Sequence, residues 1–183
     1  MIFVKSKKLC AGRISDLIKS VGLLMLFIAS VMVGIMLTEK LKNKIVILKS
    51  IKLLLQQFKR DITYSMPTLS ELFSNADIEP ILQFTDMISR KLENGYSPEE
   101  SISKSIDLTP SLSVLSDEEK SFLIQTFSSV GKSDAESQTL LLENAVGRID
   151  YYIETAIENQ RKNSKVYMTA SVYIGLAVVI ILL

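Results

Sequence analysis

The 183-residue chain contains no histidine and no tryptophan, and its only cysteine is Cys10. Without histidine there can be no Ser-His-Asp triad, and the zinc sites built from cysteine and histidine are excluded too. A single cysteine cannot form a disulfide within the chain. The seven glycines are scattered, and neither G-x-x-x-x-G-K-[ST] nor G-x-G-x-x-G occurs. We therefore expect no enzyme, no cofactor and no metal ion.

Charge of one sign is not in excess either. The chain has 21 lysines and arginines against 20 acidic residues, a net charge of +1. This balance argues against nucleic-acid binding by electrostatics. The acidic runs 99–100 and 117–119 could be imagined as metal ligands. They are more typical of the first turn of a helix, where acids interact favourably with the helix dipole.

Two long stretches, 20–38 and 166–183, contain no charged residue at all. About 20 apolar residues in a helix cross a bilayer, so we predict two transmembrane helices that contact the lipid bilayer. The alternative is that one stretch is a signal peptide or a buried core helix. A basic leader, 1–19, precedes the first stretch, but the apolar run is longer than that of a usual signal peptide and no A-x-A site follows.

Lysine and arginine near the ends of the two stretches predict the orientation. Nine lie on the side of the segment 39–165 and five lie in the leader. Because cytoplasmic loops carry the excess of these residues, we expect 39–165 in the cytoplasm and both termini outside. The two apolar stretches contain no Asp, Glu, Lys or Arg, and nothing in them resembles an ion or proton path.

The segment 39–165 contains the helix start and stop signals that are typical of a helical domain. S-x-x-E capping boxes, in which a serine and a glutamate satisfy the free N–H groups of a helix start, occur three times. They are Ser97 with Glu100, Ser116 with Glu119, and Ser133 with Glu136. Prolines and glycines separate the apolar helical patterns between them. We predict an all-α protein, with a bundle of about six helices between the two membrane helices.

One short stretch of this segment is a candidate site. Gly131 is expected to end one helix, because glycine takes the left-handed conformation without steric cost. Ser133 is expected to cap the next helix. Asp134 and Gln138 lie one helical turn apart and can point the same way, so these four residues form a candidate partner-binding motif. The alternative is that Asp134 only serves the helix N-terminus and Gln138 only packs.

Three parts of the chain resemble the stage III sporulation protein AB family. They are the run 61–64 (Asp-Ile-Thr-Tyr), the run 127–134 followed by Gln138, and the apolar end with Gly175. The order Pro67-Thr68-Leu69 departs from the Thr-Pro-Leu of that family. The segment 92–100 is similar to a segment of the type II secretion platform protein F.

The resemblance implies a part in endospore formation, in the mother-cell membrane facing the forespore. It also implies two kinds of partner, namely a cytosolic secretion-type ATPase of the same operon and other stage III sporulation membrane proteins. The main alternative is an accessory or platform protein of a type II secretion or pilus machine outside sporulation. A membrane-bound hydrolase is a third reading, against which the lack of histidine counts.

Overall fold

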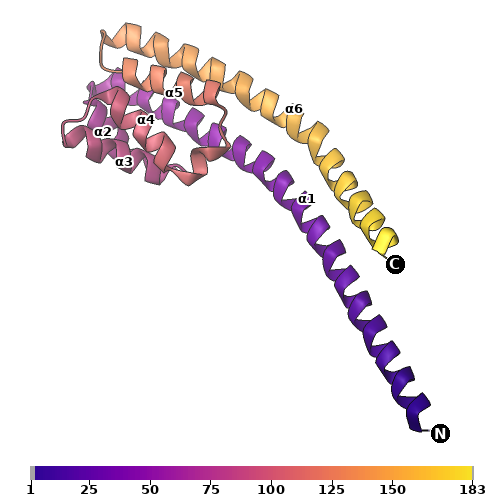
Figure 1. Ribbon diagram of the computed structural model, residues 1–183. Coiled ribbons are helices and arrows are strands. Elements are labelled where there is room, and N and C mark those ends of the chain that lie inside the picture. The colour runs from indigo at the N-terminus through magenta and orange to yellow at the C-terminus, as the bar shows by residue number, and fades with distance from the viewer. Residues whose placement is uncertain (1–2, 183) are drawn as a thin grey trace. The chain divides into compact units, whose positions relative to one another are not determined.

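The computed structural model describes the backbone of residues 3–182 and the side chains of 21–22 and 24–181. In this part of the chain every regular element is a helix, and no strand occurs (Figure 1). The all-α prediction is confirmed. The elements are α1 (Phe3–Ser65), α2 (Leu69–Ser74), α3 (Leu82–Glu93), α4 (Pro98–Leu108), the 3-10 helix η1 (Pro110–Val114), α5 (Asp117–Ser129) and α6 (Ala135–Leu182).

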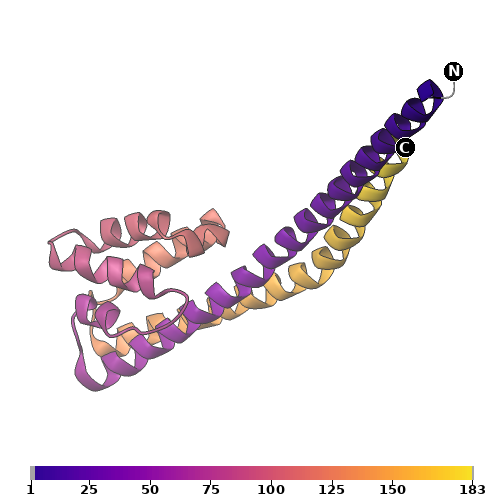
Figure 2. The same ribbon diagram turned by 90° about the horizontal axis from the view of Figure 1, so that it is seen from below.

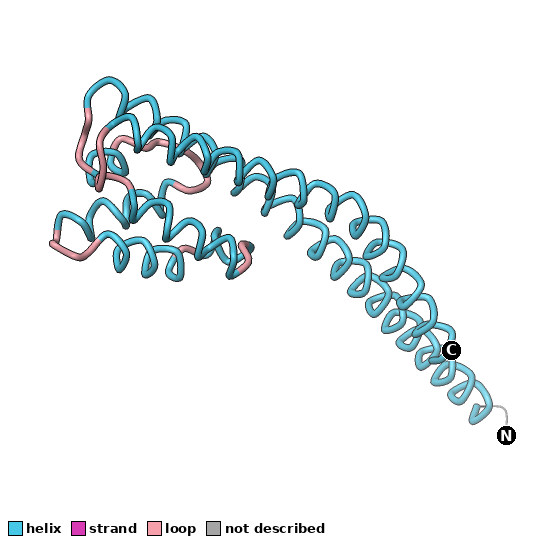
Figure 3. The backbone as a smooth tube through the Cα atoms, turned by 90° about the horizontal axis from the view of Figure 1, so that it is seen from above, coloured by secondary structure: helices cyan, strands magenta, loops and turns pink. Residues whose placement is uncertain are grey.

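The chain divides into two compact units. One consists of Met1–Glu39 with Gln160–Leu183, and the other is Lys40–Asn159. Helices α1 and α6 belong to both units, and the loops only join the helices of the second unit (Figure 3). The bundle is therefore built from the later part of α1, from α2 to α5, and from the first part of α6. The six helices include the two that carry the apolar stretches.

The core of the bundle is centred on four phenylalanines from four helices. Phe58, Phe73, Phe84 and Phe127 are all fully buried. Their rings pack mostly edge to face, with centroids 5.0–6.4 Å apart, which is a favourable arrangement for aromatic pairs. The apolar face of α1 covers this cluster with Ile47, Leu48, Ile51, Leu54, Leu55 and Ile62.

Two ion pairs align α1 with α6 inside the bundle. Lys52 Nζ lies 2.6 Å from Asp150 Oδ1, and Lys59 Nζ lies 3.3 Å from Glu143 Oε2. The lysine number rises by seven while the acid number falls by seven, so the two helices are antiparallel here. The same two contacts fix which residues of α1 and α6 lie at the same level along the bundle.

The first unit contains the two apolar stretches, and α1 and α6 lie side by side in it (Figure 2). Leu24–Ser65 and Ala135–Ile181 are long and apolar enough to cross a membrane, and only 11% of each apolar window is buried. A core helix of a soluble protein would be mostly buried, so these helices fit a membrane protein. The side chains of the predicted leader, 1–19, lie outside the described residues.

Small residues let the two helices of the first unit approach closely. Ser30 Oγ donates a hydrogen bond to the carbonyl of Ser171 at 2.7 Å. A Cβ at Gly34 would lie 2.9 Å from the Cβ of Ser171, and one at Gly175 would lie 3.2 Å from the Cβ of Ser30. The pairs 30/34 and 171/175 each have the small-xxx-small spacing that favours helix contacts in membranes.

Gly147 differs from these glycines because it faces open space. It lies in the interior of α6, and a Cβ added there would meet nothing within 4 Å. Glycine inside a helix costs roughly 0.5–1 kcal/mol relative to alanine. Packing within the bundle therefore does not explain this glycine.

Candidate partner-binding corner

Ser116 and Glu119 form a complete capping box at the start of α5. Glu119 N donates to Ser116 Oγ at 3.3 Å, and Ser116 N donates to Glu119 Oε2 at 2.7 Å. Ser97 makes only half of its predicted box. Its Oγ accepts from Glu100 N at 3.2 Å, but the Glu100 carboxylate accepts from Lys104 Nζ instead.

A further capping box at the start of α2 was missed by the sequence reading. Thr68 Oγ1 accepts from Glu71 N at 3.3 Å, and Glu71 Oε2 accepts from Thr68 N at 2.7 Å. These hydrogen bonds lower the pKa of Glu71, the one from the Thr68 backbone contributing most. The T-x-x-E spacing after Pro67 was the signal that could have shown it.

The predicted cap at Ser133 is wrong, because Asp134 caps α6. Asp134 Oδ1 accepts from Ser137 N at 3.0 Å, and Oδ2 accepts from Ser137 Oγ at 2.8 Å. The bond from the Ser137 backbone is the main cause of the lowered pKa of Asp134. The helix begins at Ala135, which places the aspartate, and not the serine, at the cap position.

Gln138 braces the loop between α5 and α6. Its Oε1 accepts from Gly131 N at 2.9 Å, and its Nε2 donates to the carbonyl of Ser133 at 2.6 Å. Gly131 has φ +85°, the left-handed conformation expected of it. The structure thus gives Gly131, Asp134 and Gln138 local roles in one corner, and Gln138 does more than pack.

We expect Gly131→Val to lower the free energy of unfolding by about 1–2 kcal/mol, because a β-branched residue is strained at positive φ.

Asp134→Ala should also destabilise the bundle, and by more at neutral pH than under acid conditions. The reason is that a lowered pKa adds stability only while the carboxylate is ionised. Urea unfolding of the full chain in detergent, followed by proteolysis, measures both. Ser133→Ala is the control. A loss of stability from Ser133→Ala as large as that from Asp134→Ala would contradict the assignment of Asp134 as the cap of α6.

A groove with a volume of about 390 Å³ lies at this corner, where the ends of α1, α2, α4, α5 and α6 meet. It brings together the candidate residues Gly131 and Gln138, while Asp134 and Ser133 do not line it. Lys132 is the only charged residue of its lining, which consists of Ile62, Met66, Pro67, Thr68, Leu69, Pro98, Val130, Gly131, Lys132 and Gln138.

One large apolar side chain just after α1 is exposed at this corner. Met66, which lines the groove, is 68% exposed. Met66 also has φ +46°, an unusual conformation for a residue other than glycine. Exposed large side chains beside an apolar groove are typical of a surface that a partner covers.

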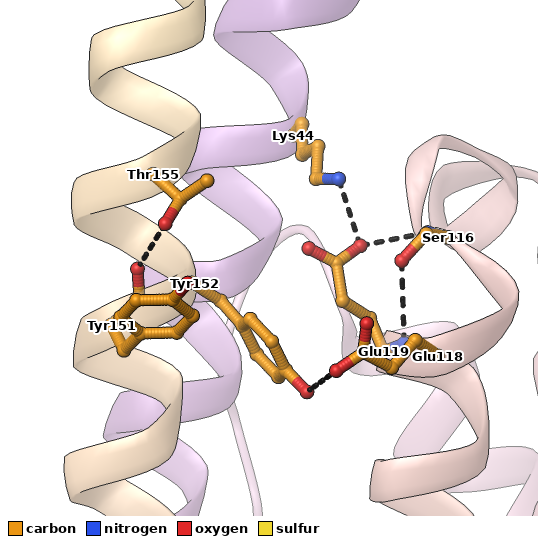
Figure 4. A network of polar contacts seen from close by, with 7 residues as sticks. All are labelled: Lys44, Ser116, Glu118, Glu119, Tyr151, Tyr152 and Thr155. Atoms are coloured by element: carbon orange, nitrogen blue, oxygen red, sulfur yellow. Dashed lines mark hydrogen bonds and ion pairs between the residues drawn. The ribbon is translucent and has the colours of Figure 1, made fainter.

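The main polar network of the bundle holds helices together (Figure 4). Lys44 Nζ lies 2.8 Å from the buried Glu119 carboxylate, which joins α1 to α5. Tyr152 donates to Glu118 Oε1 at 3.1 Å, and the Arg148 guanidinium contacts both side chains. Burial raises the pKa of Tyr152, and the hydrogen bond between Arg148 and the Tyr152 hydroxyl raises the pKa of Arg148. All groups here are paired, as in a structural network.

The acidic runs do not form a metal site among the described residues, where no group of three or more His, Cys, Asp or Glu side chains could hold an ion. Glu99 and Glu100 lie in the first turn of α4, and 117–119 lie in the first turn of α5. These are the positions in which acids interact favourably with the helix dipole.

Comparison with known families decides the affiliation of the chain. The pattern described as stage III sporulation protein AB matches residues 19–183, which is nearly the whole length and includes both apolar stretches. The chain belongs to the stage III sporulation protein AB family. It is therefore a sporulation-related protein, as the resemblance implied. No match was found among curated proteins or among solved structures.

The match to the stage III sporulation protein AB family covers every part of the corner. It also begins at residue 19, so the basic leader falls almost wholly outside it. The features that the family shares thus extend from the first apolar helix through the bundle to the second.

Proposed function

We propose that this stage III sporulation protein AB family member is a non-catalytic platform of an endospore-formation complex. In this proposal the two apolar helices anchor it in the mother-cell membrane, facing the forespore, beside other stage III sporulation membrane proteins. The bundle lies in the cytoplasm, as the distribution of lysine and arginine favours. There it binds a cytosolic secretion-type ATPase and so links the ATPase to the membrane complex.

The corner groove is the observation that supports this role. The first turn of α6 lies 24 residues before Asn159, the last residue of the bundle unit. A helix of that length measures about 36 Å, so the corner is at the end of the bundle farthest from the point where α6 leaves it. A partner can bind at this end without contacting the point where α6 leaves the bundle.

The lining of the groove indicates the chemistry of the partner segment. Apolar side chains from α1, α2, α4 and the adjoining loops, together with the single cation Lys132, fit a segment with an apolar anchor and an acidic neighbour. Gln138 and Asp134 are engaged within their own loop, so their substitution would disturb the corner as well as any interface. A test should change the exposed rim instead.

We expect Met66→Asp combined with Lys132→Glu to abolish capture of the ATPase by the full chain in detergent. The first change places a charge beside the apolar groove, and the second reverses the charge of its rim. The matched control is Leu108→Asp combined with Lys120→Glu, since Leu108 is 59% exposed and neither residue lines the groove. The control should bind as the unmodified chain does.

Normal capture by the Met66/Lys132 variant would exclude this groove as the binding site. No capture by the unmodified chain would reject the platform function itself. Spore formation with each variant in place of the native chain provides the second readout, and only the groove variant should block it.

A further inference from the structure

The outward face of α1 in the bundle combines basic and apolar side chains. Val46 is 48% exposed and Leu53 is 54% exposed, and lysine or arginine occurs between and beside them. All lie on one side of the helix, because their spacings of three, four or seven residues follow the helical period. We name this face the basic stripe; its members are Lys42, Val46, Lys49, Leu53, Arg60 and Tyr64, all exposed.

The outward face of α6 is the counterpart, with acidic and apolar side chains. Leu140 is 60% exposed and Tyr151 is 64% exposed, and Gly147 lies between them, facing open space. We name this face the acidic stripe; its members are Glu136, Leu140, Gly147, Tyr151 and Glu154, all exposed.

The charges of the two stripes are not used inside the bundle. Lys44, Lys52 and Lys59 of α1 form ion pairs with acids of the same chain. Lys49 and Arg60 of the basic stripe and Glu154 of the acidic stripe form none within the described part of the chain. Opposite charges on two apolar helix faces fit an interface between helices better than a solvated surface.

We propose that the basic stripe of one copy binds the acidic stripe of a second copy of this chain. Copies anchored in one membrane have the same orientation, and α1 and α6 are antiparallel in the bundle. The α1 of one copy therefore runs antiparallel to the α6 of its neighbour, as it does to its own α6.

In the register that the ion pairs Lys52–Asp150 and Lys59–Glu143 define, the stripes match at one charged position and at one apolar position. Leu53 lies level with the space between Gly147 and Tyr151, and Lys49 lies level with Glu154. A side chain at 147 would fill the place that Leu53 takes. The glycine, which packing within the chain leaves unexplained, allows the neighbouring helix to approach.

The contact joins two different faces, so after pairing one copy keeps a free acidic stripe and the other keeps a free basic stripe. Such a heterologous contact adds further copies and closes into a ring if the rotation between neighbours permits. The corner groove includes no residue of either stripe. Self-association and ATPase binding are therefore separable, and either can fail without the other.

The first test uses full chains in lipid nanodiscs or detergent, with Cys10→Ser throughout. One chain carries Leu53→Cys, and a second chain with a different tag carries Gly147→Cys. We expect disulfide-linked heterodimers on oxidation, and about tenfold fewer links when Leu53→Cys is replaced by Leu108→Cys, an exposed leucine outside the stripes. Equal linking by both would overturn the proposal, as would no linking with Leu53→Cys.

The second test reverses charge. Lys49→Glu with Arg60→Glu should weaken self-association about tenfold or more in sedimentation of the full chain, and Glu136→Lys with Glu154→Lys should do the same. A chain with all four changes should associate again, because the complementarity is restored. Unchanged association of the single-face variants, or no recovery in the fourfold variant, would overturn it. Loss of ATPase capture with unchanged self-association would assign the stripes to the ATPase instead.

Discussion

Phe127→Ala is expected to lower the free energy of unfolding of the bundle by about 3–5 kcal/mol, the cost of removing a large aromatic side chain from a filled core. The Phe127 ring lies 5.7 Å from Phe58, 5.3 Å from Phe73 and 6.4 Å from Phe84, centroid to centroid. All four side chains are fully buried. The substitution therefore removes packing from four helices at once, and the cavity cannot be filled by one neighbour.

Domains of this size have a total stability of about 5–15 kcal/mol, so the loss is a large part of it. Urea unfolding of the full chain in detergent, followed by limited proteolysis of the bundle, measures the change. The control is Phe122→Ala, which removes a half-buried ring of the same helix that contacts Arg148 and Tyr152. A loss from Phe127→Ala no larger than that from Phe122→Ala would show that the four-ring cluster is not the centre of the core.

The sequence was sufficient to predict the all-α class because the signals are local. Serine and glutamate three residues apart start α5, and Gly131 with a positive φ follows its end. The two uncharged stretches could be found by counting residues. Such features depend on neighbours within one or two helical turns, so no knowledge of the packing is needed to find them.

The cap of α6 was misplaced because two adjacent residues can both cap a helix. Ser133 and Asp134 both have the required side-chain oxygen, and the choice depends on whether the helix begins one residue earlier or later. Helix ends are uncertain by about that amount in any sequence reading. The brace made by Gln138 spans seven residues, back to Gly131. It depends on the path of a non-helical loop, which no periodicity describes.

The corner groove and the two stripes could not be predicted for another reason. The groove is lined by residues of α1, α2, α4 and α6 and of the loops beside them, so its existence follows from their packing and not from a motif. The stripes can be read from helical spacing, but the sequence does not show which face of α1 or α6 is buried. Lys52 and Lys59 look like the other lysines of α1 until the ion pairs to Asp150 and Glu143 are known.

Gly34→Ala is expected to separate α1 from α6 in the first unit, even though it adds one methyl group. Its Cβ would lie 2.9 Å from the Cβ of Ser171, a distance that real Cβ contacts do not show. Rotation can move the Ser171 hydroxyl aside, but it cannot move the Cβ. The helices must shift apart, and the hydrogen bond from Ser30 to the Ser171 carbonyl would be lengthened. Helix contacts in membranes rely on such close packing because lipid competes for apolar surface.

A disulfide between Ser30→Cys and Gly175→Cys, in a chain with Cys10→Ser, reports on this contact. The Cβ of a residue at 175 would lie 3.2 Å from the Cβ of Ser30, and a shift of a few tenths of an ångström brings the pair to about 3.8 Å, the mean of disulfides. We expect this disulfide to form rapidly in membranes. With Gly34→Ala it should form at least about tenfold more slowly, since the two cysteine side chains must then meet across a wider gap between the helices.

The compensating change is Ser171→Gly, which removes both atoms that the new methyl group would meet. The remaining neighbour of a Cβ at 34 is the carbonyl oxygen of Tyr167 at 3.4 Å, an ordinary contact. The double change Gly34→Ala with Ser171→Gly should therefore restore rapid disulfide formation. If Gly34→Ala alone leaves the rate unchanged, or if Ser171→Gly fails to rescue it, then Gly34 and Ser171 do not set the distance between these two helices.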